Sequence, residues 1–175
     1  MKTSKINGEW TTKELQIDKN WLINLDHLDK QELFKATKFA IKSNKSLYDI
    51  KDSDFPLNNF VNKINLIKKQ IQFGFGFVVI KGLPIAEFND EETKVMLWGL
   101  GQYLGHPEKQ DKAGSLLHVV TDTGASFANT DHIRGFQTNE ELQFHTDGAD
   151  IFALLCIRNA KTGGLSKLVS SVAIF

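Results

Sequence analysis

The chain has 175 residues, of which 41% are hydrophobic and 24% are charged, a composition typical of one soluble globular domain rather than a disordered or fibrous chain. The 21 Lys and Arg residues balance the 21 Asp and Glu residues, so the charge indicates no basic surface for nucleic acid. The longest apolar runs are far shorter than the ~20 residues that span a bilayer, and residues 1–16 carry no apolar export signal. We therefore expect a cytoplasmic protein that binds neither nucleic acid nor a membrane.

Three amphipathic helices are predicted in the first part of the chain. The first covers about 29–44, where apolar residues have helical spacing and Asp29 with Glu32 resembles a capping box. The second begins after Pro56, because apolar residues recur there at intervals of four, three and four. The third opens at Asn89 with another capping box and ends at Gly105. The first part of the chain is therefore expected to be rich in helix.

Segments of bulky β-forming residues predict buried strands in the rest of the chain. The first is Phe73–Lys81, and three more are expected at Ser115–Thr121, Ile151–Ile157 and Leu165–Ile174. The only cysteine, Cys156, lies in one of these strands and is expected to be a small buried hydrophobic residue. Helices followed by strands indicate an α+β fold, in which the helices buttress a sheet or barrel.

The most informative short motif is His145 followed by Asp147. On an extended segment, side chains two residues apart leave the same face, so this imidazole and this carboxylate can bind one ion. They supply two of the three ligands in the facial triad that holds non-haem Fe(II). The same spacing also suits a histidine that is hydrogen-bonded to the carboxylate in a turn, so both interpretations are open at this point.

Three stretches of sequence resemble one enzyme family. They are GFGFVVIKGLP at 74–84, LGQYLGHPEKQ at 100–110 and ELQFHTDGADIFALLCIRNAKTGGLSKLVSS at 141–171, and they resemble the TauD/TfdA family of Fe(II)- and 2-oxoglutarate-dependent oxygenases. The resemblance runs from Phe73 onward and implies a double-stranded β-helix, a jelly-roll of the clavaminate synthase type. It implies a single domain in which residues 1–72 form the N-terminal buttressing helices and residues 73–175 the first strands of an incomplete β-helix core.

The resemblance also implies a site and its cofactors. His145 and Asp147 correspond to iron ligands, and Ser166 lies where the family places a hydroxyl against 2-oxoglutarate. The implied reaction uses O₂ to hydroxylate a small, anionic organic substrate, with release of succinate and CO₂. Residues just before the ligands are candidate substrate contacts, namely Asn139, Gln143 and Phe144.

Two residues of the family pattern are not found at matching positions. The enzymes that the chain resembles have, far downstream, a second histidine ligand and an arginine that binds the distal carboxylate of 2-oxoglutarate. Here no histidine follows His145, and the only later arginine, Arg158, lies in an apolar segment. We therefore expect the chain to be the N-terminal fragment of a larger oxygenase and to be catalytically inactive by itself.

Two alternatives to this function stay open. One is a catalytically inactive binding or interaction fragment of the same fold. The other is a different metal enzyme, in which His145 and Asp147 hold zinc together with His118 or His132. Taken alone, His118 is expected to be a hydrogen-bonded interior histidine. The sequence also leaves open whether the protein forms a homo-oligomer.

Overall fold

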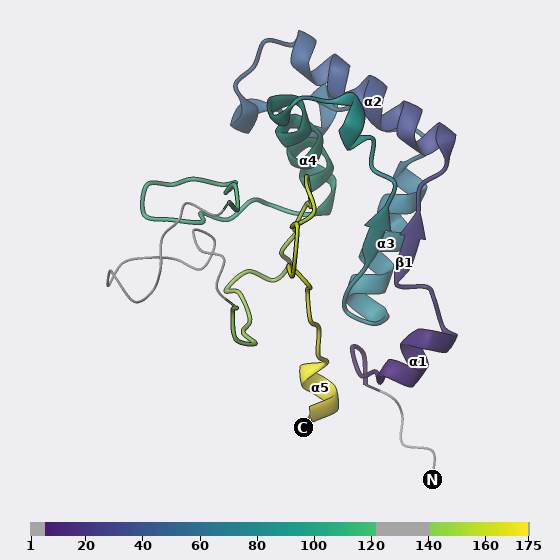
Figure 1. The fold of residues 1–175 in the computed structure, drawn as a ribbon. Helices are drawn as coiled ribbons and strands as arrows, with labels where there is room; N and C mark the ends of the chain where they lie inside the picture. Colours follow the sequence, from purple (N-terminus) through teal and green to yellow (C-terminus); the bar gives the residue numbers. More distant parts are fainter. Residues whose placement is uncertain (1–5, 122–140, 175) are drawn as a thin grey trace. The chain divides into compact units, whose positions relative to one another are not determined.

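The structure is a computed structural model that describes residues 6–121 and 141–174 (Figure 1). The chain divides into two units, of which the first comprises residues up to His106 together with Leu155–Phe175 and the second is Pro107–Leu154. No helix in these described ranges is long and apolar enough to cross a membrane.

Helices dominate the first unit, and its strands are short. The helices are α1 (Thr12–Ile17), α2 (His27–Lys42), α3 (Val61–Phe73), α4 (Asp90–Leu104) and α5 (Ser171–Ile174), the strands are β1 (Leu22–Asn24) and β2 (Val79–Lys81), and the single 3₁₀ turns are η1 (Leu47–Asp49), η2 (Asp52–Asp54) and η3 (Ile85–Glu87). The two strands lie side by side in parallel, with Leu22 opposite Val79 and Asn24 opposite Lys81 (Figure 1). Helices α2 and α3 both lie in the connection between them, as a parallel pair requires a long crossover.

Helix α2 begins two residues earlier than the sequence pattern predicted. Asp26 is its N-cap and forms a reciprocal capping box with Asp29, in place of the expected pair Asp29 and Glu32. The carboxylate of Glu32 instead accepts the backbone N–H groups of Asn58 and Phe60 at the start of α3. Because Phe60 has no side-chain cap of its own, Glu32 satisfies donors that α3 would otherwise leave unpaired.

The other two predicted helices are confirmed. Helix α3 starts after Phe60, and α4 has the expected N-cap Asn89 and ends before Gly105. The expected strand at 73–81 is much shorter than predicted, because α3 continues to Phe73, the chain bends at 74–76, and only Val79–Lys81 pairs with β1. The chain then turns at Gly76, whose φ of 79° is a backbone conformation that other residues rarely adopt.

The core of the first unit lies where α2, α3 and the α2–α3 connection pack on α4 (Figure 1). Its largest fully buried hydrophobic side chains are Phe55, Phe60, Leu33, Ile50, Ile67 and Met96. Gly99 of α4 makes this packing fit, since a Cβ atom at that position would overlap the ring of Phe55. The backbone of α4 and the aromatic ring therefore approach more closely than any other residue type at 99 would allow.

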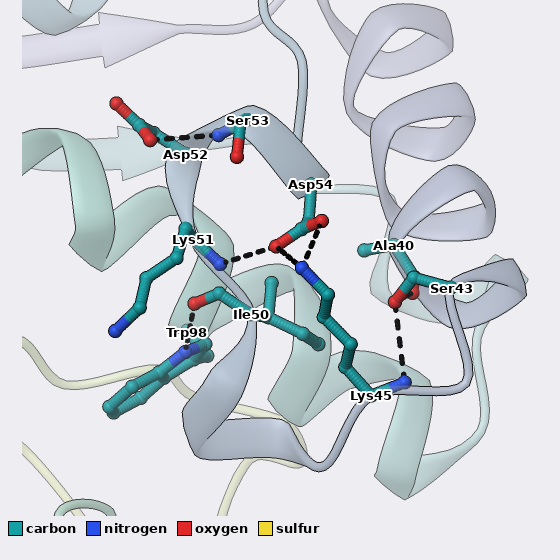
Figure 2. A network of polar contacts seen from close by, with 9 residues as sticks. All are labelled: Ala40, Ser43, Lys45, Ile50, Lys51, Asp52, Ser53, Asp54 and Trp98. Carbon is teal, nitrogen blue, oxygen red and sulfur yellow. Dashed lines mark hydrogen bonds and ion pairs between the residues drawn. The ribbon is translucent and has the colours of Figure 1, made fainter.

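The connection between α2 and α3 is tied to the helices by polar contacts, shown in Figure 2. Lys45 Nζ lies 2.7 and 2.8 Å from the two carboxylate oxygens of Asp54, which also accept the backbone N–H of Lys51 at 3.0 Å. These donors, above all Lys45, hold the pKa of Asp54 below its usual range. Trp98 Nε1 of α4 donates to the carbonyl of Ile50 at 3.0 Å. The loop thus has an internal ion pair and an anchor on α4.

The strands predicted at 115–121, 151–157 and 165–174 are not formed in this structure. Apolar side chains of these segments are exposed, for example Phe152 at 57% and Leu154 at 76%, and Cys156 is exposed rather than buried. A strand is stable only beside a hydrogen-bonded neighbour, and β1 and β2 are the only paired strands in the described part of the chain. The last of these segments instead ends in the one-turn helix α5. The structure is α+β, as expected, but it does not display the incomplete β-helix core.

A carboxylate organises the described start of the second unit. Asp111 accepts the backbone N–H of Ser115 at 3.0 Å and lies 3.0 Å from His118 Nε2. The hydroxyl and N–H of Ser115, then His118 and the N–H of Gly114, lower the pKa of Asp111 to about 2. His118 is half-buried and hydrogen-bonded, in agreement with the expectation for this residue.

The contact between Gly99 and Phe55 predicts opposite effects for two glycines of α4. Gly99→Ala is expected to lower the free energy of unfolding by about 1–3 kcal/mol, because the methyl group overpacks the core. Gly101→Ala is the matched control, since nothing lies within 4 Å of its added methyl group and alanine favours helix. Urea denaturation measures both changes. Equal stability of Gly99→Ala and the parent chain would contradict this account of the core.

The hydrogen bonds to Asp111 predict an acid-sensitive contribution to stability. A lowered pKa in the folded state means that the contribution is complete above the ordinary value of 3.8 and is lost as the pH falls toward about 2. An NMR titration of the Asp111 carboxyl is expected to show a midpoint near 2. Ser115→Ala removes the hydroxyl donor and is expected to raise this midpoint. A midpoint near 3.8 in the parent chain is the contrary result.

Candidate functional site

The predicted iron ligands His145 and Asp147 lie in the second unit, in a stretch without helix or strand. Both side chains are exposed. The extended strand that the sequence pattern assumed is absent here, and the backbone bends at 148–150, directly after Asp147. A common face for the two side chains stays a prediction, because no sheet holds this stretch extended here.

The ring of His145 is oriented by a backbone carbonyl. Its Nδ1 lies 2.7 Å from the carbonyl oxygen of Gln143, and a carbonyl oxygen only accepts hydrogen bonds. Nδ1 therefore carries the hydrogen and donates, and in the neutral ring Nε2 keeps the lone pair. Histidines that bind metals commonly donate from their other ring nitrogen in this way. The hydrogen bond makes Nε2 the donor atom that His145 offers to a metal.

The donor set suits Fe(II), although the described residues do not close a site around it. An imidazole nitrogen and a carboxylate are two members of the 2-His-1-carboxylate set. In the described ranges Asp147 has no hydrogen-bond partner, so its carboxylate is available to a cation. No three His, Cys, Asp or Glu side chains come together there to hold a metal ion. His145 and Asp147 are thus a partial ligand set.

The other predicted site residues are placed as follows. Gln143 contributes its backbone carbonyl to His145, a role that the sequence pattern did not indicate. Phe144 is largely exposed next to it, and Ser166 is exposed on the segment that belongs to the first unit. The predicted substrate contact Asn139 and the alternative zinc ligand His132 lie outside the described residues.

Two further side chains, His118 and Arg158, have structural partners. His118 faces Asp111 and is not gathered with His145 and Asp147 among the described residues. Arg158 Nη2 lies 3.2 Å from a carboxylate oxygen of Asp90, the first residue of α4, where both side chains are largely exposed. The partner of Arg158 could not have been found from sequence spacing, because 68 residues separate it from Asp90 and no motif joins them.

Comparison with known proteins agrees with the motif around His145 and Asp147. The family described as "Taurine catabolism dioxygenase TauD, TfdA family" matches residues 43–175. FR-33289 synthase from Streptomyces rubellomurinus is 28% identical over 166 residues, which cover 95% of this chain and 49% of that protein. The taurine hydroxylase-like protein SAT17 from Stachybotrys chartarum is 26% identical over 180 residues, covering 98% of this chain and 46% of that protein.

The family match includes both candidate ligands, Ser166 and the helices α3 and α4, whereas α1, β1 and α2 precede it. The chain spans about half the length of the curated relatives that it matches. It belongs to the TauD/TfdA family of dioxygenases.

Proposed function

We propose that this chain is part of an Fe(II)- and 2-oxoglutarate-dependent dioxygenase that hydroxylates a small, anionic organic substrate. Membership of a dioxygenase family supports the reaction class. The observation that carries the metal assignment is the hydrogen bond from His145 Nδ1 to the Gln143 carbonyl, because it leaves Nε2 able to bind a metal and Asp147, two residues on, has no hydrogen-bond partner among the described residues. One matched relative is named as taurine hydroxylase-like, and taurine is a small sulfonate, which supports an anionic substrate.

Each proposed residue has a distinct role. His145 offers Nε2 and Asp147 its carboxylate to Fe(II), and the negative charge of Asp147 offsets part of the charge of the cation. The hydroxyl of Ser166 donates a hydrogen bond to a carboxylate of 2-oxoglutarate. Asn139, Gln143 and Phe144 contact the substrate. When bound, Fe(II) with 2-oxoglutarate and O₂ supplies the oxidising chemistry that releases succinate and CO₂.

The second histidine ligand and the arginine for 2-oxoglutarate are assigned to sequence beyond these 175 residues. This assignment is supported by the share of the relatives that the chain covers, 49% and 46%. On this proposal residues 1–175 form the N-terminal half of one domain, and the exposed apolar segments near 151–157 are completed as strands by the other half. We place the whole protein in the cytoplasm, with a small molecule as its substrate.

A catalytically inactive binding fragment of the same fold is the second candidate. It is favoured by one specific observation, that the described residues gather no third metal ligand. The two candidates differ in metal binding, because a fragment without catalytic function has no need of the free Asp147 carboxylate or of the oriented His145 ring. Metal analysis after anaerobic purification also separates iron from zinc, the metal of the remaining alternative.

Fe(II) binding tests the proposed ligands directly. His145→Ala and Asp147→Ala are each expected to weaken Fe(II) binding about tenfold or more, because water must replace a protein ligand. Anaerobic titration calorimetry measures this change on the chain without any substrate. His106→Ala and Asp150→Ala are matched controls, since both side chains are exposed and have no assigned role. Equal Fe(II) affinity in His145→Ala and His106→Ala would refute the assignment, and no Fe(II) binding by the whole protein, with its proposed second histidine, would favour the binding fragment.

A further inference from the structure

Residues 6–10, here called the N-terminal strap, have Gly8 at their centre. Its N–H donates to the carbonyl of Gly74, just after α3, at 3.0 Å, and its φ of 81° suits glycine. Trp10 adds a second anchor, because its indole Nε1 donates to the carbonyl of Phe75 at 3.0 Å. The Trp10 ring also packs on Phe77, with 5.4 Å between the ring centroids. The strap is thus held to the glycine-rich turn that precedes β2.

The same glycine holds the last part of the described chain. Ser170 Oγ donates to the carbonyl of Gly8 at 2.6 Å, across 162 positions of sequence. Ser170 is only 6% exposed, whereas the other described residues from 156 to 169 are exposed. Its hydroxyl also accepts the N–H of Ala173 at 3.1 Å and so caps α5. Val172 lies in van der Waals contact range of a Cβ built on Gly8.

These contacts make Ser170 the buried anchor of an otherwise exposed segment. Arg158 also forms an ion pair with Asp90, but the two side chains are 79% and 61% exposed, and such surface pairs contribute little. Ser166 is four residues before Ser170, so the chain between them spans at most about 14 Å. An anchor at Ser170 therefore limits where the Ser166 hydroxyl can lie.

We propose that the N-terminal strap, through the hydroxyl of Ser170, positions the segment that carries Ser166, and that Ser170 is a positioning residue for the 2-oxoglutarate contact. The role of Ser166 rests on the proposed function, whereas the anchoring of residues 165–174 does not. The strap then couples the turn at Gly74 to a segment that lies near the end of the described chain. A hydroxyl is required at 170, because an alkyl side chain leaves the Gly8 carbonyl without its donor.

Amide hydrogen exchange tests the anchor on the chain without metal or substrate. Ser170→Ala is expected to raise the exchange rates of the α5 amides by about two- to tenfold, above all that of Ala173, whose N–H donates to Ser170 Oγ, because these are the amides of the segment that have protection to lose. Ser170→Thr keeps the hydroxyl and is expected to restore rates close to those of the parent. Ser171→Ala changes an exposed neighbour and Arg158→Ala removes the exposed ion pair, so both serve as controls with unchanged rates.

Trp10→Phe provides a second variant that leaves Ser170 intact. It removes the indole donor to Phe75 but keeps a ring against Phe77, so it loosens the strap itself. Faster exchange of the α5 amides is then expected, although the altered residue is 160 positions before Ser170 in the sequence. Unchanged exchange of the α5 amides in both Ser170→Ala and Trp10→Phe would overturn the proposal.

Binding of 2-oxoglutarate separates this inference from the proposed function, and it is measured on the whole protein that supplies the proposed second histidine and arginine, with Fe(II) present and oxygen excluded. Ser170→Ala is expected to weaken binding several-fold, with rescue by Ser170→Thr and no change in Ser171→Ala. Faster exchange with 2-oxoglutarate affinity equal to that of the parent would overturn the positioning role. A whole protein that binds no 2-oxoglutarate, while the exchange differences are seen, supports the anchor and counts against the proposed function instead.

Discussion

The arrangement of α2, α3 and α4 depends on one contact, the close packing of Phe55 on Gly99. Phe55 belongs to the connection between α2 and α3, and its ring is fully buried against the backbone of α4. Tyr103, one turn further along α4, donates from its hydroxyl to the carbonyl of Phe55 at 2.9 Å. Burial is the main cause that raises the pKa of Tyr103, and it outweighs the backbone N–H of Leu57, which donates to the Tyr103 hydroxyl at 3.2 Å and lowers the pKa. Apolar and polar contacts together therefore hold the α2–α3 connection against α4.

Other contacts of the first unit lie around the packing of Phe55 on Gly99. Trp98 holds the carbonyl of Ile50 on the other side of the same connection, and Glu32 of α2 caps the helix that follows it. The end of that helix, at Gly74, receives the N-terminal strap. A continuous series of contacts thus joins the helical core to Gly8 and, through it, to Ser170. This series of contacts connects the packing at Gly99 with the segment around Ser170.

The candidate iron ligands depend on local contacts and not on this series of contacts. The orientation of His145 comes from the carbonyl of Gln143, two residues away, and Asp147 follows on the same short stretch. These two of the three expected ligands therefore depend on local sequence. Local encoding explains why the motif could be found from spacing and family resemblance. The Gln143 carbonyl could not be found in this way, because backbone hydrogen bonds leave no residue-type signal in a sequence.

The sequence by itself indicated the helices α2, α3 and α4 and the family, and it predicted the candidate ligand pair. Apolar periodicity placed α3, and the Asn89 capping box placed the start of α4, because both are local properties of the chain. Only the tertiary structure decided that Glu32 caps α3, that Gly99 accommodates Phe55 and that Ser170 reaches Gly8. It also decided the fate of the apolar segment 151–157, which was predicted to be a buried strand and is exposed. The reason is physical: a helix satisfies its backbone hydrogen bonds within itself, whereas a strand, a buried cap or a close contact needs a partner from elsewhere in the chain.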